Sequence, residues 1–386
     1  MNPPRAFFYV QHLLGIGHLK RAATLARALA AEGLQVTLAS GGPKVPGLRL
    51  DGVRLVQLPP ASAADLSFKT LLDENGRPVD DGWRQARKAA LLDAWRAADP
   101  QALILELFPF GRRQMSFELL PLLEAAMASA RRPVILCSVR DILGGQKSAE
   151  RQQETLTLVE RYFDGVLVHG DRSIVAFERT FPPAARIAQR LHYTGYVVDE
   201  AARPGNPAGK DEVVVSAGGG AVGAGLLEAA IRARPLTAMR ARVWRILAGD
   251  NLSEAAFQKL AGLANAVGGI EVERSRPDFP ALLSNCALSV SQAGYNTLLE
   301  TVQARARAVV VPFAGGGESE QILRARCFAG RGLLELVEES ALTPQVLAEA
   351  IDRVAAKPPP PPGGIDLDGA RKGAALIARW AQERAA

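Results

Sequence analysis

The chain has 386 residues, of which 48% are hydrophobic, and carries a formal net charge of +6. This length predicts two domains, each with its own core. The charge is mild and evenly spread, which argues against a nucleic-acid binder but permits weak peripheral contact with an anionic membrane surface or an anionic substrate.

Cysteine and histidine usage argues against a metal site. The three cysteines are far apart, as expected of buried thiols in a reducing cytosol, and the four histidines lack metal-ligand spacing. The apolar runs are shorter than the roughly 18 residues of a membrane span. The first of them, AFFYV at 6–10, is typical of a buried strand rather than a signal peptide. We therefore expect a cytoplasmic protein, with peripheral contact at the inner membrane face as an alternative.

The first half alternates apolar runs with helical patterns. The runs are nearly unbroken, which is typical of parallel strands covered on both faces. The predicted strands are 6–10, 34–39, 53–58, 102–105, 134–139 and 165–168. The predicted helices are 19–31, 83–97, 118–130 and 149–163. This alternation predicts a doubly wound parallel sheet.

A polar segment rich in proline and glycine follows, and a second series of the same kind begins after it. The predicted strands of this series are 213–216, 243–248, 269–272, 287–290, 308–311 and 333–336. We expect a domain over 1–198, a linker over 199–210 and a second domain over 211–364. Past a stiff tract of prolines, the helical segment 365–386 is expected to cross back to the first domain. The fold class is α/β, with two Rossmann-like doubly wound domains facing a cleft.

A short glycine turn, Gly15-Ile16-Gly17-His18, follows the first strand and opens the first helix. Glycines there allow a tight turn and leave room for a ligand. A helix N-terminus lowers the pKa of an imidazole and favours the neutral form that a general base needs. His18 is therefore the first candidate base, with an incidental turn as the alternative. The full dinucleotide glycine pattern is missing, which disfavours NAD.

Two carboxylates follow apolar strands of the first half. Glu106 opens the segment ELFPFGRR, and Asp141 lies in SVRDILGG. Ligands of α/β sheets bind at the carboxyl ends of the strands, so each carboxylate is a candidate acceptor contact or base behind His18. An ion pair between Arg140 and Asp141 is the structural alternative. The mixture FPFGRR fits a lipid contact or, more simply, a loop anchor.

The second half offers three phosphate-friendly turns. The loop after its first strand holds Gly219 and Gly220, and two further strand-turn-helix units span 288–325. Unpaired N–H groups and the helix dipole favour a phosphate at each helix start. Glu300 is placed to accept hydrogen bonds from a ribose diol, and Glu320 with Gln321 from sugar hydroxyls. The remaining candidate ligands are Gly17, Ser291, Gly294, Tyr295, Asn296 and Thr297. Together these residues predict a pocket for a nucleotide diphosphate sugar.

These motifs resemble glycosyltransferase family 28 of the GT-B fold, in particular the branch with the N-acetylglucosaminyltransferase of the peptidoglycan lipid intermediate and uncharacterised relatives. The resemblance implies inverting, metal-independent transfer from a UDP-sugar to an acceptor hydroxyl in cell-envelope or glycan biosynthesis, with no cofactor. It implies that Glu300 holds ribose, Glu320 and Gln321 the donor sugar, and Gly219 and Gly220 the diphosphate, while His18 faces the reaction centre. The acceptor-side motifs of that branch are absent here, so the acceptor stays open.

Two other functions remain compatible with the same residues. A nucleotide-sugar hydrolase or epimerase would use the same donor site and the same glycine-histidine turn. A non-catalytic nucleotide-sugar-binding subunit would keep the donor site alone, and His18, Glu106 and Asp141 argue against it.

Overall fold

The computed structural model describes residues 3–13, 15–65, 70–145, 148–201, 205–219, 223–315 and 319–385. The chain divides into two compact units. Unit 1 comprises Met1–Asp199 and Asp366–Ala386, and unit 2 comprises Glu200–Ile365. The candidate ligand Gly220 lies outside the described residues.

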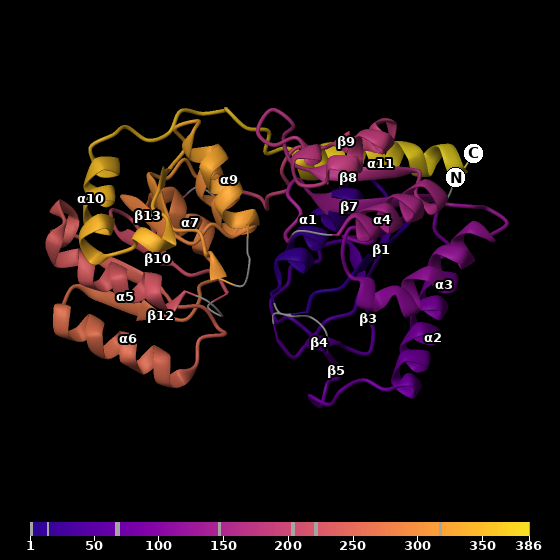
Figure 1. Cartoon of the computed structure of the whole chain (residues 1–386), viewed down its shortest axis with the longest axis horizontal. Coiled ribbons are helices and arrows are strands. Elements are labelled where there is room, and N and C mark those ends of the chain that lie inside the picture. The colour runs from indigo at the N-terminus through magenta and orange to yellow at the C-terminus, as the bar shows by residue number, and fades with distance from the viewer. Residues whose placement is uncertain are drawn as a thin grey trace. The chain divides into compact units, whose positions relative to one another are not determined.

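Unit 1 is built on a seven-stranded sheet in the order β3-β2-β1-β6-β7-β8-β9, and its neighbouring strands pair in parallel (Figure 1). The strands are β1 Arg5–Val10, β2 Gln35–Ser40, β3 Val53–Gln57, β6 Ala102–Glu106, β7 Val134–Arg140, β8 Gly165–His169 and β9 Leu191–Tyr193. The pattern predicted six of them. The short, half-buried β9 and the small hairpin of β4 Ser62–Ala63 and β5 Leu71–Leu72 were not predicted. Chain order reverses between β1 and β6, where doubly wound sheets bind ligands.

Helices cover both faces of this sheet. One face packs on α1 Gly17–Ala31 and α11 Gly369–Ala385, so the last helix belongs to the first unit (Figure 1). The other face packs on α2 Asp81–Ala98, α3 Ser116–Met127 and α4 Ala149–Tyr162. The unit also has the 3-10 helices η1 Arg113–Met115, η2 Phe177–Arg179 and η3 Pro182–Arg190. Strand residues therefore alternate between two apolar cores, which explains the unbroken hydrophobic runs.

The aromatic segment after β6 belongs to one of these cores. Phe108 and Phe110 are each 1% exposed, and the ring of Phe110 packs edge-on against those of Phe177 and Phe181. The lipid-contact interpretation of this segment is therefore wrong for its aromatic rings. These rings bury apolar area in the core and thereby anchor the loop. Burial of large aromatic rings stabilises the fold.

Unit 2 repeats the plan with a six-stranded parallel sheet in the order β12-β11-β10-β13-β14-β15 (Figure 1). The strands are β10 Val213–Ser216, β11 Trp244–Leu247, β12 Ile270–Glu273, β13 Leu288–Ser291, β14 Ala308–Val310 and β15 Glu335–Leu336. The helices are α5 Ala224–Ala233, α6 Glu254–Val267, α7 Phe279–Asn285, α8 Tyr295–Gln303, α9 Glu320–Ala329 and α10 Pro344–Ala355. The 3-10 helices are η4 Arg234–Leu236, η5 Ala238–Ala241 and η7 Glu339–Ala341. Its order reverses between β10 and β13.

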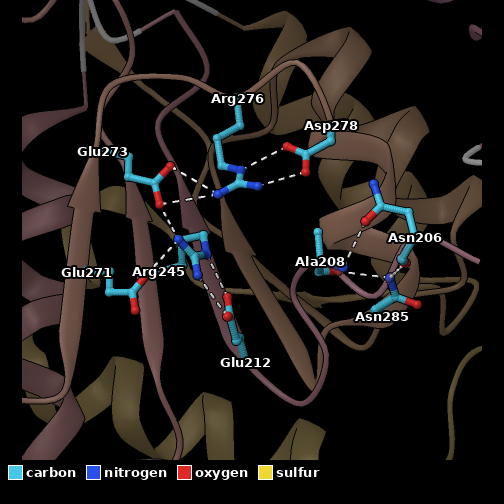
Figure 2. Close-up of polar contacts among 9 residues, drawn as sticks. All are labelled: Asn206, Ala208, Glu212, Arg245, Glu271, Glu273, Arg276, Asp278 and Asn285. Carbon is cyan, nitrogen blue, oxygen red and sulfur yellow. Dashed lines mark hydrogen bonds and ion pairs between the residues drawn. The ribbon is translucent and has the colours of Figure 1, made fainter.

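An ion-pair network ties three strands of the second sheet together (Figure 2). Arg245 of β11 makes a two-pronged contact with Glu212, at 2.7 and 2.8 Å, and also pairs with Glu271 and Glu273 of β12. Hydrogen bonding to Glu212 holds the pKa of Arg245 above its usual value. Arg276 is similarly clamped by Asp278. Both arginines of the network are paired with carboxylates of the same unit, so we interpret its role as structural.

Candidate functional site

Unit 1 has a cluster of polar side chains at the carboxyl edge of its sheet, on the same face as one of its apolar cores. Ile104, Leu136 and Leu167 point into the core beneath α1 and α11. Side chains two residues further along a strand share its face. The next inward positions are Glu106 at the end of β6, Ser138 and Arg140 on β7, and His169 at the end of β8; Glu106 is in register with Ser138, and Arg140 with His169. At the carboxyl edge of the sheet, polar side chains thus follow the apolar ones on the same face.

His18 lies in the first turn of α1, and its Nδ1 is 2.9 Å from Oε1 of Glu106. An ionised carboxylate only accepts hydrogen bonds, so Nδ1 carries the hydrogen and Nε2 keeps a lone pair. Burial, together with the charges of Arg140, Arg112 and Arg21, lowers the pKa of His18 to about 3, although the hydrogen bond that His18 donates to Glu106 acts in the opposite direction. The imidazole is therefore neutral near pH 7, as a base must be, with its side chain 15% exposed.

Glu106 is held by three donors and is 1% exposed. Besides His18 it accepts from Nη2 of Arg21 and, at 2.5 Å, from the hydroxyl of Ser138. Burial alone would raise the pKa of this carboxyl, but Arg21 and the bonds from His18 and Ser138 outweigh it and hold the pKa well below its usual range. Glu106 is consequently ionised and orients His18.

A hydrogen-bonded chain continues behind Glu106. Ser138 Oγ is 2.9 Å from Nε2 of His169, whose Nδ1 is 2.9 Å from the hydroxyl of Thr194. Burial, with the charge of Arg21, lowers the pKa of His169 to about 3, so this ring is neutral. Since Ser138 donates to Glu106, Nε2 of His169 must donate to Ser138. The one hydrogen of the Thr194 hydroxyl is shared between Nδ1 of His169 and the carbonyl of Gly195, which is 3.0 Å away. These three residues fix the carboxylate from behind.

The second candidate carboxylate, Asp141, occupies a different place. It follows Val139 and Arg140, so the strand alternation directs it away from the face that carries Glu106. It is fully buried, and it accepts from the hydroxyl of Tyr196 at 2.8 Å and from the N–H of Ile142 at 3.0 Å. The structure gives it an anchoring role, and the function of Asp141 as a base stays an untested prediction.

In unit 2 the two central strands end side by side. Ser216 of β10 is in register with Ser291 of β13. Gly218, at φ +64°, turns the chain so that its N–H donates to the hydroxyl of Ser216 at 3.2 Å. Gly219 continues that turn. The Ser291 hydroxyl is buried and, within the described ranges, has no hydrogen-bond partner. A buried hydroxyl of this kind favours a polar ligand.

The start of α8 offers an uncapped helix end next to Ser291. Its N-cap is Gly294, which has no side chain to satisfy the first N–H groups. Those groups and the helix dipole attract an anion. Tyr295 is buried in the first turn, Asn296 and Thr297 are half-buried, and Glu300 lies half-buried one turn further on. These predicted ligands therefore share one helix start, while their contact with a nucleotide remains a prediction.

The start of α9 is tied to that of α8 through Arg324. Its fully buried guanidinium lies 3.0 Å from Oε1 of Glu320 and 4.9 Å from the centre of the Tyr295 ring. Oε1 of Gln321 accepts from the N–H of Phe313 at 3.1 Å. Glu320 and Gln321 thus already have protein partners, which position them. The arginine was missed from the sequence, although its spacing of four residues from Glu320 on a helix was a usable signal.

The partners of Glu106 were also missed. Arg21 lies one turn after His18, and Ser138 and His169 are inward-facing polar residues near the carboxyl ends of two apolar strands. Only the pairing of the strands brings these residues close to Glu106, so no local sequence motif predicts the contact. In the described part of the chain, no group of three or more histidine, cysteine or acidic side chains is arranged to hold a metal ion. Nor is any helix described there long and apolar enough to cross a membrane.

The chain is similar to known proteins both in sequence and in fold. Residues 214–361 match the model of the glycosyltransferase family 28 C-terminal domain. A UDP-N-acetylglucosamine–N-acetylmuramyl-(pentapeptide) pyrophosphoryl-undecaprenol N-acetylglucosamine transferase of Geobacillus kaustophilus (strain HTA426) is 28% identical over 188 residues, which are 45% of this chain and 50% of that protein. A protein of the same name from Anaeromyxobacter sp. (strain K) is 32% identical over 77 residues, 20% of each. The chain thus spans about a fifth to a half of the length of such curated relatives.

Similarity of fold extends over nearly the whole chain. The structure of CalG4, the calicheamicin glycosyltransferase, superimposes with a TM-score of 0.59 at 15% identity, covering 99% of this chain and 95% of that one. MurG of Acinetobacter baumannii gives a TM-score of 0.55 at 16% identity, covering 98% and 95%. The chain therefore has the GT-B fold of glycosyltransferases. Its second unit is similar, over residues 214–361, to the C-terminal domain of glycosyltransferase family 28.

Proposed function

We propose that this chain is an inverting glycosyltransferase that moves a sugar from a nucleotide diphosphate sugar to an acceptor hydroxyl. The observation that carries the proposal is the 2.9 Å contact between Nδ1 of His18 and Glu106. It fixes a neutral imidazole with its second nitrogen available as a base. A binding subunit without chemistry would have no use for a buried carboxylate that orients one histidine.

The second unit would hold the donor. The glycine turn after β10 and the start of α8 supply N–H groups for the diphosphate, with the Ser291 hydroxyl beside them. Glu300 is assigned to the ribose, and Glu320 and Gln321 to the transferred sugar. Uridine is favoured because the curated relatives are named as UDP-N-acetylglucosamine transferases. Helix N-termini stabilise the charge of a departing diphosphate, so this mechanism requires no metal ion.

The reaction follows from the two sets of groups. Nε2 of His18 takes the proton of the acceptor hydroxyl while its oxygen attacks the anomeric carbon. The bond from that carbon to the diphosphate oxygen breaks on the opposite face, which inverts the configuration. Glu106 stabilises the imidazolium that forms. A well-placed base of this kind contributes on the order of 100- to 10,000-fold.

The acceptor and the location belong to the same proposal. The curated relatives are named for an acceptor linked to pyrophosphoryl-undecaprenol, which favours cell-envelope glycans as the field of action. We place the chain in the cytoplasm, where its net charge of +6 would support weak contact with an anionic membrane face.

A thermal-shift screen of nucleotides and nucleotide sugars tests the donor assignment. A ligand at a hundredfold excess over its dissociation constant stabilises a fold by roughly 2.7 kcal/mol. We expect the largest shift with UDP and a UDP-sugar, and no shift with any nucleotide would refute the proposal. Incubation of the best UDP-sugar without acceptor then separates transfer from hydrolysis or epimerisation, because those two reactions need no acceptor.

A further inference from the structure

Gln292, just past the end of β13, has a buried side chain with no hydrogen-bond partner in the described ranges of the chain. The residue is 7% exposed, and only its backbone N–H is engaged, by the carbonyl of Ser216 at 3.2 Å. A carboxamide offers two N–H donors and one carbonyl acceptor. Burying such a group without partners is costly, so Gln292 is suited to a ligand that supplies them.

The side chain of Gln292 reaches toward the start of α5. Strand alternation places it on the same face as Val290, the face of the sheet that packs on α5. A methyl group added at Gly223 would lie 3.3 Å from Nε2 of Gln292 and 2.5 Å from Cβ of Ala217, just past β10. Glycine at position 223 therefore keeps a side chain away from the carboxamide.

Two helix starts without side-chain caps flank this carboxamide. The N-cap of α5 is Gly223 and that of α8 is Gly294, and neither has a side chain to satisfy the first N–H groups of its helix. These N–H groups attract an anion. The two helices follow β10 and β13, the neighbouring strands between which the chain order of the sheet reverses. Doubly wound sheets bind their ligands at such a reversal.

Other buried glutamines have partners within the protein. The amide nitrogen of Gln11 donates to the carbonyls of His12 and Ala61, and its Oε1 accepts from Arg87. Oε1 of Gln101 accepts from the backbone N–H of Arg5 at 2.9 Å. These two side chains hold loops and strands together. Gln292 differs from them, because its carboxamide is buried at a ligand-binding edge without holding any described segment.

We infer that Gln292 binds the outer phosphate of the nucleotide diphosphate, the phosphate that carries the transferred sugar. The inference rests on the proposed function of the same site. There Glu300, one turn into α8, is assigned to the ribose, so the inner phosphate would lie at the start of that helix. The outer phosphate would then extend toward the second uncapped start, at Gly223, which Nε2 of Gln292 approaches.

This position gives Gln292 a role in the reaction as well as in binding. Negative charge grows on the outer phosphate as its bond to the anomeric carbon breaks. A fixed N–H donor aimed at that oxygen stabilises the growing charge. The same donor would distinguish a nucleoside diphosphate from a monophosphate, because a monophosphate has no group at this place.

Calorimetry of the intact protein with UDP, UMP and inorganic pyrophosphate tests the inference. We expect Gln292→Met to raise the Kd for UDP about tenfold, the usual effect of losing one hydrogen bond to a charged group. The Kd for UMP should stay within a factor of two. Gln292→Glu should weaken UDP binding further, because its carboxylate repels the phosphate. The same two changes at Gln345, an exposed residue of α10, are the matched controls and should leave both affinities unchanged.

Urea unfolding of the ligand-free protein separates a ligand-binding role from a structural one. Methionine fills nearly the same space as glutamine, and the carboxamide of Gln292 has no partner to lose in the described chain. Replacing an unpartnered buried polar group with an apolar one should not destabilise the fold. We therefore expect Gln292→Met to unfold at the same urea concentration as the wild type, or at a higher one.

Three results would overturn the inference. Both Gln292 variants could keep wild-type affinity for UDP, or Gln292→Met could weaken UMP and UDP equally, which would place the residue at the inner phosphate. A lower unfolding midpoint for Gln292→Met would assign the side chain to the fold.

Pyrophosphate distinguishes failure of the inference from failure of the proposed donor. If the wild type binds pyrophosphate but not UDP, and Gln292→Met weakens pyrophosphate binding, Gln292 binds phosphate and the uridine donor is refuted. If the wild type binds neither compound, the inference and the proposed function fall together.

Discussion

Nδ1 of His18 lies 2.9 Å from Oε1 of Glu106, so two residues that the sequence offers as rival bases form one unit. Their roles follow from burial. Glu106 is enclosed by Arg21, His18 and Ser138 and stays ionised, whereas His18 is neutral and keeps 15% of its side chain exposed. In the proposed reaction the imidazole is the group that meets substrate, and the carboxylate sets its orientation.

Replacing His18 should therefore remove chemistry and leave donor binding intact. We expect His18→Ala to lower kcat by on the order of 100- to 10,000-fold, the contribution of a positioned base. The Kd for UDP should stay within a factor of two, since the donor ligands belong to unit 2. Single-turnover kinetics and calorimetry measure the two quantities. Unchanged turnover would remove His18 from the reaction.

Glu106→Gln should reduce both activity and stability. The change removes the negative partner of buried Arg21, and breaking a buried pair typically costs about 3–5 kcal/mol of folding free energy. It also lets the His18 ring adopt its other tautomer, which nitrogen chemical shifts report directly. Glu124→Gln is the matched control, because Glu124 is an exposed carboxylate that pairs with exposed Arg161. Equal losses of stability in the two variants would contradict the buried-pair assignment.

Acid should destabilise the fold through the buried histidines before any carboxylate titrates. Burial lowers the pKa of His169 to about 3 in the folded chain, against about 6.5 when unfolded. Below pH 6.5 the unfolded chain therefore binds a proton that the folded chain does not, and unfolding becomes easier as pH falls. The slope is at most about 1.4 kcal/mol per pH unit for one such group.

The pH dependence has a simple variant test. We expect urea unfolding between pH 7 and pH 5 to show that the free energy of unfolding depends less steeply on pH in His169→Gln than in the wild type. The difference should be up to about 1.4 kcal/mol per pH unit. Glutamine keeps a donor toward Ser138 but cannot titrate. Parallel slopes for the two proteins would show that His169 takes up its proton over the same pH range in the folded and the unfolded chain, contrary to the effect of its burial.

The donor assignment gives a separate prediction for Glu300. If its carboxylate binds the ribose diol, Glu300→Ala should raise the Kd for UDP several-fold, because one or two charge-assisted hydrogen bonds are lost. Glu349→Ala on α10 is the control, since that side chain is exposed in the same unit. Calorimetry with UDP distinguishes them. Wild-type affinity in Glu300→Ala would exclude this residue from the ribose site.

Much of the fold was predictable, because buried parallel strands appear in the sequence as apolar runs. The twelve predicted runs correspond to twelve strands of the two sheets. Strand β9 was not predicted, because Leu191–Tyr193 is short and only half-buried. Pattern alone also predicted that polar residues at strand ends would gather at one edge. It could not say which carboxylate would meet His18, because that depends on strand register and on the face each residue takes.

Glu106 and Asp141 illustrate the difference. Both follow apolar strands, and both were candidates on equal terms. The alternation of β7 sends Asp141 toward Tyr196, while Glu106 and Ser138 share the face of α1. Arg21 could not be predicted for a related reason. A buried arginine cannot be distinguished from a surface arginine in the sequence until its carboxylate partner is known, and here that partner is 85 residues away.

The last prediction concerns Arg324, which links the two helix starts of unit 2. Its guanidinium is fully buried between Glu320 and the ring of Tyr295. Arg324→Met would remove the ion pair with Glu320 and loosen the starts of α8 and α9. We expect unit 2 to lose about 3–5 kcal/mol of stability, as for other broken buried pairs. Affinity for UDP should fall with it, because the N–H groups of α8 would lose their fixed geometry.

Arg326→Met provides the comparison on the same helix, since Arg326 is exposed and its ion pair with Glu338 lies at the surface. Surface pairs contribute at most about 1 kcal/mol, so this variant should unfold and bind UDP like the wild type. Urea unfolding and calorimetry of both variants decide the matter. If Arg324→Met is stable but binds UDP weakly, Arg324 contacts the donor itself. If the two variants behave alike, the buried contact with Glu320 does not hold the helix starts together.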